Sequence, residues 1–192
     1  LAASGTGFIA ALSTAAIGAL STDQVANLTT SQVEALSTAQ VKALTTAGMD
    51  ALTTAQLNAL ETRDVAALST AQVQAIGSDI AALSTGNLNA MGTAQIAALT
   101  TAQVDSLTTT QLNAMETADV AALTTAQVRA ITAADMSELS TGTLNALGTA
   151  QIAALLTDQI ADLSTTQLAA METRDVAALT TAQIQAVAAG DL

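Results

Sequence analysis

The residues best suited to chemistry in this chain form two clusters of mixed charge, Glu61-Thr-Arg63-Asp64 and Glu172-Thr-Arg174-Asp175. Carboxylates bind Ca²⁺, but the loops that hold this ion carry more oxygen ligands at closer spacing than either cluster supplies. The simpler interpretation is a solvated ion pair together with a helix cap. The functional alternative is a lateral contact or a weak Ca²⁺ site. The residues available for lateral contacts are Glu61, Arg63, Asp64, Glu172, Arg174 and Asp175.

Other catalytic chemistry lacks its usual residues. The sequence has no His and no Cys, which excludes the common nucleophile–base pairs, haem ligation through His and thiolate metal sites. Gly5 and Gly7 lie in Ser-Gly-Thr-Gly, without the rest of a phosphate-binding loop. We therefore predict no enzymatic activity, no catalytic residue, no metal ligand and no cofactor.

The charge balance limits the partners of the chain. Sixteen acidic residues oppose four basic ones, and the net charge is −12. The basic residues Lys42, Arg63, Arg129 and Arg174 are scattered, whereas a nucleic-acid surface needs clustered Lys and Arg. No apolar run approaches the roughly 18 residues needed to cross a bilayer. The sequence predicts no nucleic-acid partner and no membrane insertion.

The elements that position these clusters are repeats of eight residues, seen clearly as Leu-Ser-Thr-Ala-Gln-Val-Gln-Ala at Leu68–Ala75. Position 1 of this octad is Leu, Ile, Met or Val, position 3 is nearly always Thr, position 5 is usually Gln or Asp, and position 6 is apolar. Positions 4 and 7 vary and carry many charges. We predict an irregular leading segment over residues 1–11 and an octad solenoid over residues 12–192. Because the chain ends inside an unfinished octad, we expect the array to continue beyond it.

A longer period overlies the octad. The octads that begin at Leu60, Met115 and Met171 share the pattern Glu-Thr-x-Asp-Val-Ala-Ala after their first residue, and they begin 55 and 56 residues apart. The unit at Ile76 is one residue short, which accounts for the difference. Seven octads therefore form a super-repeat, which suggests about three and a half octads per superhelical turn or one turn of seven.

Three folds compete for this pattern. A single long helix would rotate each octad by about 80° relative to the last, so no apolar stripe would persist. A β-solenoid agrees with the Thr and Val content, but positions 1 and 6 would face opposite sides of a strand. A solenoid of very short helices agrees best, because a helix-start signal recurs in every octad. We predict an all-α solenoid with one short helix per octapeptide repeat, and the alternative is the β-solenoid.

The helical solenoid gives each fixed position a role. Thr at position 3 is a candidate N-cap, and Ser or Thr at position 2 with Gln at position 5 also matches the spacing of a capping box. Position 6 and the next position 1 share a helix face and should be buried. The expected structural caps are Thr22, Thr38, Thr54, Thr70, Thr101, Thr125 and Thr181. The expected core residues at position 6 include Val25, Val41, Leu57, Val73, Val104, Val128 and Ile184.

The segment Leu-Thr-Thr-Ala-Gln-Val at Leu123–Val128, with its copies, resembles the Thr-Ala-Gln octapeptide tracts of very large secreted bacterial surface proteins of the adhesin-like class. The resemblance covers residues 12–192. It implies export and a role at the cell surface, and it transfers no binding residues to this chain.

These observations lead us to expect a structural protein. The chain would be a repeat segment of an extracellular bacterial filament, stalk or giant adhesin, outside the cell or on its surface. Stacked octads would form a thin rod whose variable faces contact like chains or neighbouring filaments. The alternative is a binding module in which ladders of Thr and Gln side chains hold ice, a glycan or a partner protein.

Overall fold

A computed structural model gives the fold of residues 4–187. The first three residues of the expected leading segment (1–3) and the last five residues of the expected solenoid (188–192) lie outside the described residues. Within residues 4–187 the regular elements are twenty-two α-helices and one 3-10 helix, with no strand. The α-helices are four to seven residues long. The prediction of an all-α solenoid of very short helices is confirmed, and the β-solenoid alternative is wrong.

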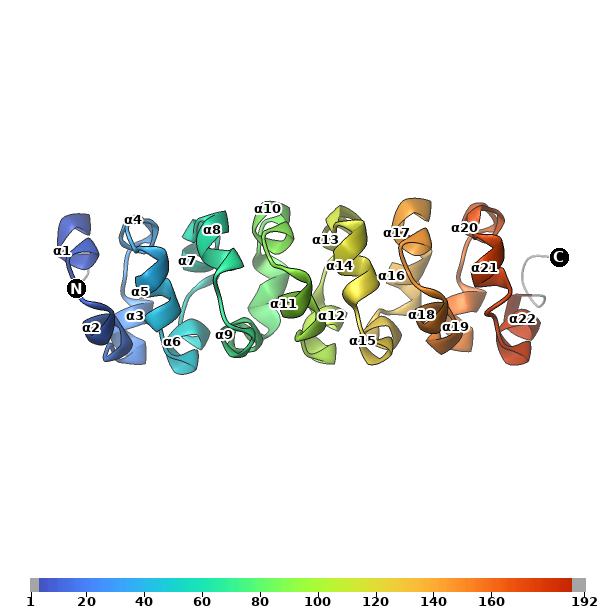
Figure 1. Ribbon diagram of the computed structural model, residues 1–192, viewed down its shortest axis with the longest axis horizontal. Coiled ribbons are helices and arrows are strands. Elements are labelled where there is room, and N and C mark those ends of the chain that lie inside the picture. The colour runs from blue at the N-terminus through green and yellow to red at the C-terminus, as the bar shows by residue number, and fades with distance from the viewer. Residues whose placement is uncertain (1–3, 188–192) are drawn as a thin grey trace. The chain divides into compact units, whose positions relative to one another are not determined.

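The chain divides into two compact units, Leu1–Ala98 (unit 1) and Leu99–Leu192 (unit 2), and the helices of each unit wind in successive turns (Figure 1). The elements of unit 1 are α1 Thr6–Ala10, α2 Thr14–Gly18, α3 Thr22–Ala26, α4 Thr30–Glu34, α5 Thr38–Ala43, α6 Thr46–Asp50, α7 Thr54–Ala59, α8 Thr62–Ala66, α9 Thr70–Ala75, η1 Gly77–Ala82, α10 Thr85–Asn89 and α11 Thr93–Ala97. The elements of unit 2 are α12 Thr101–Ser106, α13 Thr109–Ala114, α14 Thr117–Ala122, α15 Thr125–Ala130, α16 Ala133–Ser137, α17 Thr141–Asn145, α18 Thr149–Ala154, α19 Thr157–Ala161, α20 Thr165–Ala170, α21 Thr173–Val176 and α22 Thr181–Val187.

The leading segment, expected to be irregular over residues 1–11, contains a regular helix. α1 begins after the N-cap Gly5, and its Ile9 is fully buried. α1 packs against α4, and Gln40 donates a hydrogen bond to the carbonyl oxygen of Ile9 at 2.9 Å. α1 therefore forms part of the helical array of unit 1.

A capping box starts many of the helices. In α9 the Ser69 hydroxyl accepts a hydrogen bond from the Gln72 backbone N–H at 3.2 Å, and Gln72 Oε1 accepts one from the Ser69 N–H at 3.0 Å. The N-cap thus lies at position 2, where Gln three residues later makes both bonds possible. If position 3 were the N-cap, the residue three places later would be position 6, which is apolar and could not return a side-chain hydrogen bond to the N-cap. The Thr residues expected as caps are instead the first residues of their helices; they are Thr22, Thr38, Thr54, Thr70, Thr101, Thr125 and Thr181.

Many of the helices end where position 1 of the next octad becomes extended. Leu44, which follows α5, has φ −59° and ψ 134°, and its N–H still bonds to the Val41 carbonyl oxygen at 3.2 Å. Leu44 is buried, and Thr45 directly after it caps α6. One octad therefore supplies a helix, a turn and two core residues.

The core runs through each unit as two series of side chains, from positions 1 and 6. The position 6 residues Val25, Val41, Leu57, Val73, Val104 and Val128 are all buried. Ile184 at the same position is 47% exposed. Elsewhere helices pack against the helix three places later in the chain. α22 is the last described element of unit 2, so no described helix packs on it from that side.

The turn of the solenoid falls between three and four elements. Helices pack against the third helix along the chain, as α4 does on α7 and α12 on α15. The Gln side chain at position 5 reaches the element four places back, as Gln159 of α19 does to Val128 of α15. This geometry agrees with about three and a half octads per turn. The seven-octad super-repeat then corresponds to two turns, after which equivalent helices, such as α14 and α21 in unit 2, face the same way (Figure 1).

The short octad is built as a 3-10 helix. Ile76 ends α9 in a helical conformation (φ −61°, ψ −24°) rather than an extended one, so the chain enters η1 without the usual linker residue. Gly77 changes the direction of the chain with φ +59°. This conformation is unfavourable for any residue with a Cβ atom. Ile76, Ile80 and Leu83 remain buried. The deletion is absorbed locally, and the core stays continuous.

Candidate functional site

The position 5 residues form a buried polar column in each unit. Gln72 lies in α9, and its Nε2 donates hydrogen bonds to the carbonyl oxygens of Val41 at 3.0 Å and Leu44 at 2.9 Å. Its Oε1 is already used by the capping box. The same inter-turn bonds are made by Gln40, Gln56, Gln95, Gln151, Gln159, Gln167 and Gln183.

The burial of this column was not predicted from the sequence. The octad pattern gives position 5 a role in the capping box and places no Gln in the core. The signal was present: Gln recurs at position 5 in octads whose positions 4 and 7 vary freely. A surface residue would vary as positions 4 and 7 do. The position 5 amide bonds to the N-cap of its own helix and to two carbonyl oxygens of the neighbouring turn, so replacing it would leave buried polar groups without hydrogen bonds.

Asp replaces Gln at position 5 in the three octads that mark the super-repeat. Asp64, Asp119 and Asp175 are only 1%, 5% and 1% exposed. A carboxylate has no N–H to offer the neighbouring turn, so each of these residues needs another source of hydrogen bonds or charge. The three copies differ in the partners that the carboxylate finds.

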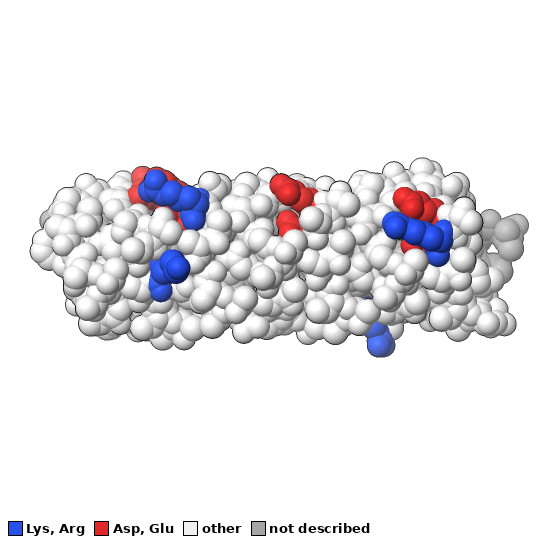
Figure 2. Space-filling view, in the orientation of Figure 1, with Lys and Arg blue, Asp and Glu red and all other residues white. Residues whose placement is uncertain are grey.

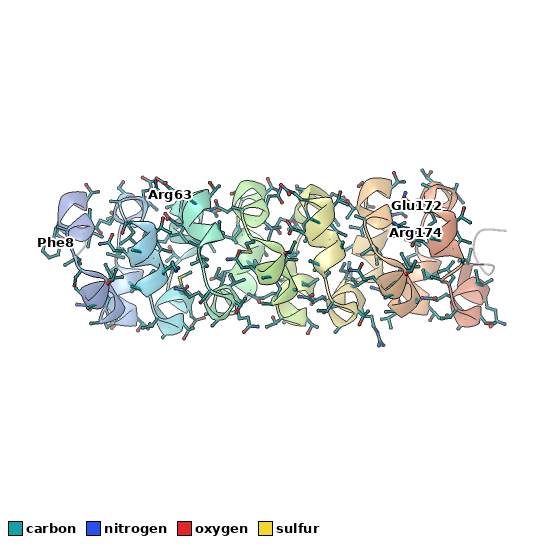
Figure 3. All side chains as sticks on the ribbon, viewed as in Figure 1. Phe8, Arg63, Glu172 and Arg174 are labelled. Carbon is teal, nitrogen blue, oxygen red and sulfur yellow. The ribbon has the colours of Figure 1, made fainter. Side chains whose placement is uncertain are left out.

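Asp64 has the best partners of the three. The hydroxyl of Thr38, the first residue of α5, donates a hydrogen bond to Asp64 Oδ1 across one turn of unit 1. Arg63 lies between two carboxylates, with Nη2 at 2.9 Å from Glu61 and Nε at 3.6 Å from Asp64 (Figure 3). Glu61 is the N-cap of α8 but makes no side-chain capping bond, so the helix-cap part of the expectation for this cluster does not hold.

Asp175 has the ion pair without the hydrogen bond. Arg174 Nε lies 3.0 Å from Glu172 and 3.6 Å from Asp175 (Figure 3). Neither carboxylate oxygen of Asp175 has a hydrogen-bond partner among residues 4–187. Asp64 and Asp175 are thus buried beneath their arginines, which leaves Glu61, Arg63, Glu172 and Arg174 at the surface as the residues able to make the expected lateral contacts.

Asp119 has neither partner. Ala118 occupies the place of the arginine, and in the described part of the chain no hydrogen bond or ion pair reaches the Asp119 side chain. Burial, and then the negative charge of Glu116, raise the pKa of Asp119 above its ordinary value of 3.8. Within unit 2, Figure 2 shows one acidic patch without a basic side chain and a second acidic patch with a basic side chain beside it.

Asparagine at position 7 adds a second inter-turn bond. Asn113 Nδ2 donates to the Glu138 carbonyl oxygen at 3.0 Å, and its Oδ1 accepts from the Ser140 N–H at 2.6 Å. Beside it lies a hollow of about 210 Å³ without a charged side chain, lined by Asn113, Met115, Thr117, Val120, Ser140, Gly142, Thr143 and Ala146. The hollow offers hydroxyl groups but no acid–base pair.

The rest of residues 4–187 offers few groups suited to chemistry. No group of three or more Asp or Glu side chains there is placed to hold a metal ion. In two marker octads the space between the carboxylates is held by a guanidinium group, which Ca²⁺ would have to displace. None of the described helices has the length and apolar character required to span a membrane.

The repeated helix, the capping box and the inter-turn amide bonds define a helical-repeat protein of the solenoid class. The sequence agrees with this class at the level of a family. The model of the ALTTAQ repeat matches residues 1–38, 30–62, 80–115, 112–139 and 130–165, and the chain belongs to this repeat family. No curated protein matches the chain.

Proposed function

We propose that this chain is a structural repeat segment of an extracellular bacterial filament, stalk or large adhesin. The observation that carries the proposal is the use of the fixed octad positions. Positions 1 and 6 fill the core, position 2 caps the helix, and position 5 ties each helix to an earlier turn, as Leu68, Val73, Ser69 and Gln72 do. The residues that are constant from octad to octad therefore stabilise the solenoid.

The variable positions support the second part of the proposal, which is association with like chains. Positions 4 and 7 face solvent and carry Lys42, Arg63, Ala118, Arg129 and Arg174. Except where position 7 carries an amide bonded to a neighbouring turn, as Asn113 does, changes at these positions leave the core, the caps and the amide column intact. The surface can thus differ from octad to octad at little cost in stability.

The acidic composition fits such a scaffold. A net charge of −12 keeps single chains apart by long-range repulsion, which salt at about 0.15 M screens beyond roughly 8 Å. Contacts between chains then depend on local pairs of side chains rather than on the overall charge.

The experiment that tests this proposal is electron microscopy of source cells with a gold-labelled antibody against the purified chain. Labelling along extracellular fibres, abolished when the antibody is first absorbed with the purified chain, is the expected result. Labelling confined to the cell interior would refute the exported structural segment and leave a soluble binding module as the better description.

A further inference from the structure

The three marker octads carry the same pair of acidic residues, in two cases with an arginine between them and in one case without it. In the octads of Arg63 and Arg174, a guanidinium group lies between the Glu at position 2 and the buried Asp at position 5, with distances of 2.9–3.6 Å. In the octad of α14, Glu116 and Asp119 are present, but position 4 is Ala118. The same acidic pair therefore exists with and without its cation inside one protein.

The open copy lacks the cation that lies beside the buried Asp in its two relatives. Asp119 is 5% exposed and has no hydrogen-bond or ion-pair partner among residues 4–187, while Glu116 is exposed and close enough to repel it. A buried carboxylate is stable when a cation or a donor compensates it. Ala118 is exposed, so a group from outside the chain has access to the place that arginine fills elsewhere.

The chain also contains cations that lack a partner of this kind. Lys42 and Arg129 are exposed, and neither has a carboxylate within 4.0 Å in the described residues. Arg129 extends from position 7 near the end of α15, the helix after α14. Arginine matches the occupied clusters in chemistry, because a guanidinium group can bond to two carboxylates at once whereas an ammonium group acts as a point charge.

We propose that the Glu116–Asp119 cluster is a docking site for Arg129 of a second copy of this chain. The contact is heterologous, because it joins a site on α14 of one copy to a side chain on α15 of another. Each copy keeps one free donor and one free acceptor, so association continues beyond a dimer. The inference rests on the proposed self-association of the structural segment and names the residues that perform it.

The first test is sedimentation velocity over a concentration series in about 0.15 M salt, where the long-range repulsion between copies is screened. The parent chain should form a ladder of oligomers that is lost at about 1 M salt, where the screening length falls to roughly 3 Å. Ala118→Arg closes the cluster from within, as Arg63 and Arg174 do, and Arg129→Gln removes the donor. Each should weaken association at least ten-fold, whereas Lys42→Gln, with the same loss of charge, should not.

The second test mixes the two defective variants. Arg129→Gln keeps an open cluster and Ala118→Arg keeps a free Arg129, so the mixture should form a one-to-one complex that neither variant forms alone. Thermal unfolding of each variant confirms that it folds. If the parent associates and neither variant changes this, the docking site is refuted while the structural function stands.

Two other outcomes also overturn the inference. A parent chain that remains monomeric at every concentration has no such contact, and the labelling of cells then decides the structural function separately. Calorimetric titration with Ca²⁺ examines the other occupant. If Ca²⁺ binds the parent but not Ala118→Arg, and no oligomer forms, the cluster holds a free cation instead of a second copy.

Discussion

The hydroxyl group of Thr38 donates a hydrogen bond to the buried carboxylate of Asp64, which follows it by 26 residues in the chain. This bond joins the first turn of α5 to the first turn of α8, and α5 packs on α8. The partner of Asp64 is therefore a position 3 residue, and the same position is exposed in α9 at Thr70.

Replacing this donor should weaken unit 1. Thr38→Val keeps the shape of the side chain but removes the hydroxyl that bonds to Asp64, and hydrogen bonds to charged groups contribute about 1.5–3 kcal/mol. We expect a loss of that size in the free energy of unfolding, measured by urea denaturation. Thr70→Val, at the same position of α9 where the hydroxyl is exposed, is the control and should change it by less than about 0.5 kcal/mol. Equal effects in the two variants would assign the loss to helix propensity.

The amide column makes a sharper prediction for Gln72→Glu. Glutamate keeps the capping box but replaces Nε2 by an oxygen that faces the carbonyl oxygens of Val41 and Leu44. We expect a loss of about 3 kcal/mol at neutral pH, because a buried charge is left without compensation. Acidification should restore much of the loss, since a protonated carboxyl can donate one bond.

Gln24→Glu is the matched control for this variant. Gln24 has the same capping box in α3, but it is exposed, and among residues 4–187 its amide makes no hydrogen bond to another turn. An acidic residue in the first turn of a helix is favourable by about 0.3–1 kcal/mol. Stability should therefore stay the same or rise, and a loss equal to that of Gln72→Glu would refute the inter-turn role of the amide.

Asp175→Gln should have the opposite sign. Both carboxylate oxygens of Asp175 lack hydrogen bonds in the described structure, and its neighbours in the column, Gln167 and Gln183, each bond to two carbonyl oxygens. A glutamine here would find the carbonyl oxygens of Leu144 and Leu147 at the corresponding places. We expect a gain of about 1–3 kcal/mol in the free energy of unfolding at neutral pH. Asp105→Gln removes an exposed carboxylate and controls for net charge; a similar gain there would contradict the argument.

Asp119 should make stability depend on pH in a defined direction. Burial raises the pKa of Asp119 in the folded state above the 3.8 of a free carboxyl, so the folded state binds its proton more tightly than the unfolded state. The favourable contribution is fully present below pH 3.8 and is lost as the pH rises from 3.8 through the raised pKa. Asp119→Asn should therefore gain stability relative to the parent over this interval and level off above it.

Chemical denaturation at a series of pH values measures this difference. Asp105→Asn, at an exposed position of α12, is the comparison. A constant difference between Asp119→Asn and the parent from pH 3 to pH 7 would mean that the carboxyl of Asp119 is not perturbed by the fold.

The sequence predicted the helices and much of the core because both follow from local pattern. Thr and Ser before Ala-Gln start a helix, and position 6 with the next position 1 forms its apolar face, as Val73 and Ile76 do. The caps lie one residue earlier than expected, because the reciprocal bonds of the capping box join Ser21 to Gln24 and make Ser21 at position 2, and not Thr22, the N-cap.

The remaining features depend on contacts between turns. The burial of Gln72 and Asp64 depends on carbonyl and hydroxyl groups 26–31 residues away, and no local pattern reveals which turn lies beside which. Ile184 was expected in the core on the same local grounds as Val128, yet exposure at that position depends on the turn that follows it.

The inter-turn bonds of the position 5 glutamines share a direction: the amide belongs to the later octad and the carbonyl oxygen to the earlier one, as in Gln56 with Val25 and Gln183 with Ile152. A protein leaves the ribosome N-terminus first. Each octad that emerges thus meets acceptors that are already in place, and its own cap has oriented the amide that will use them. Folding can therefore keep pace with synthesis, with each new turn packing on the turn before it. A long array then exposes the apolar surface of only its newest turn while it is being made.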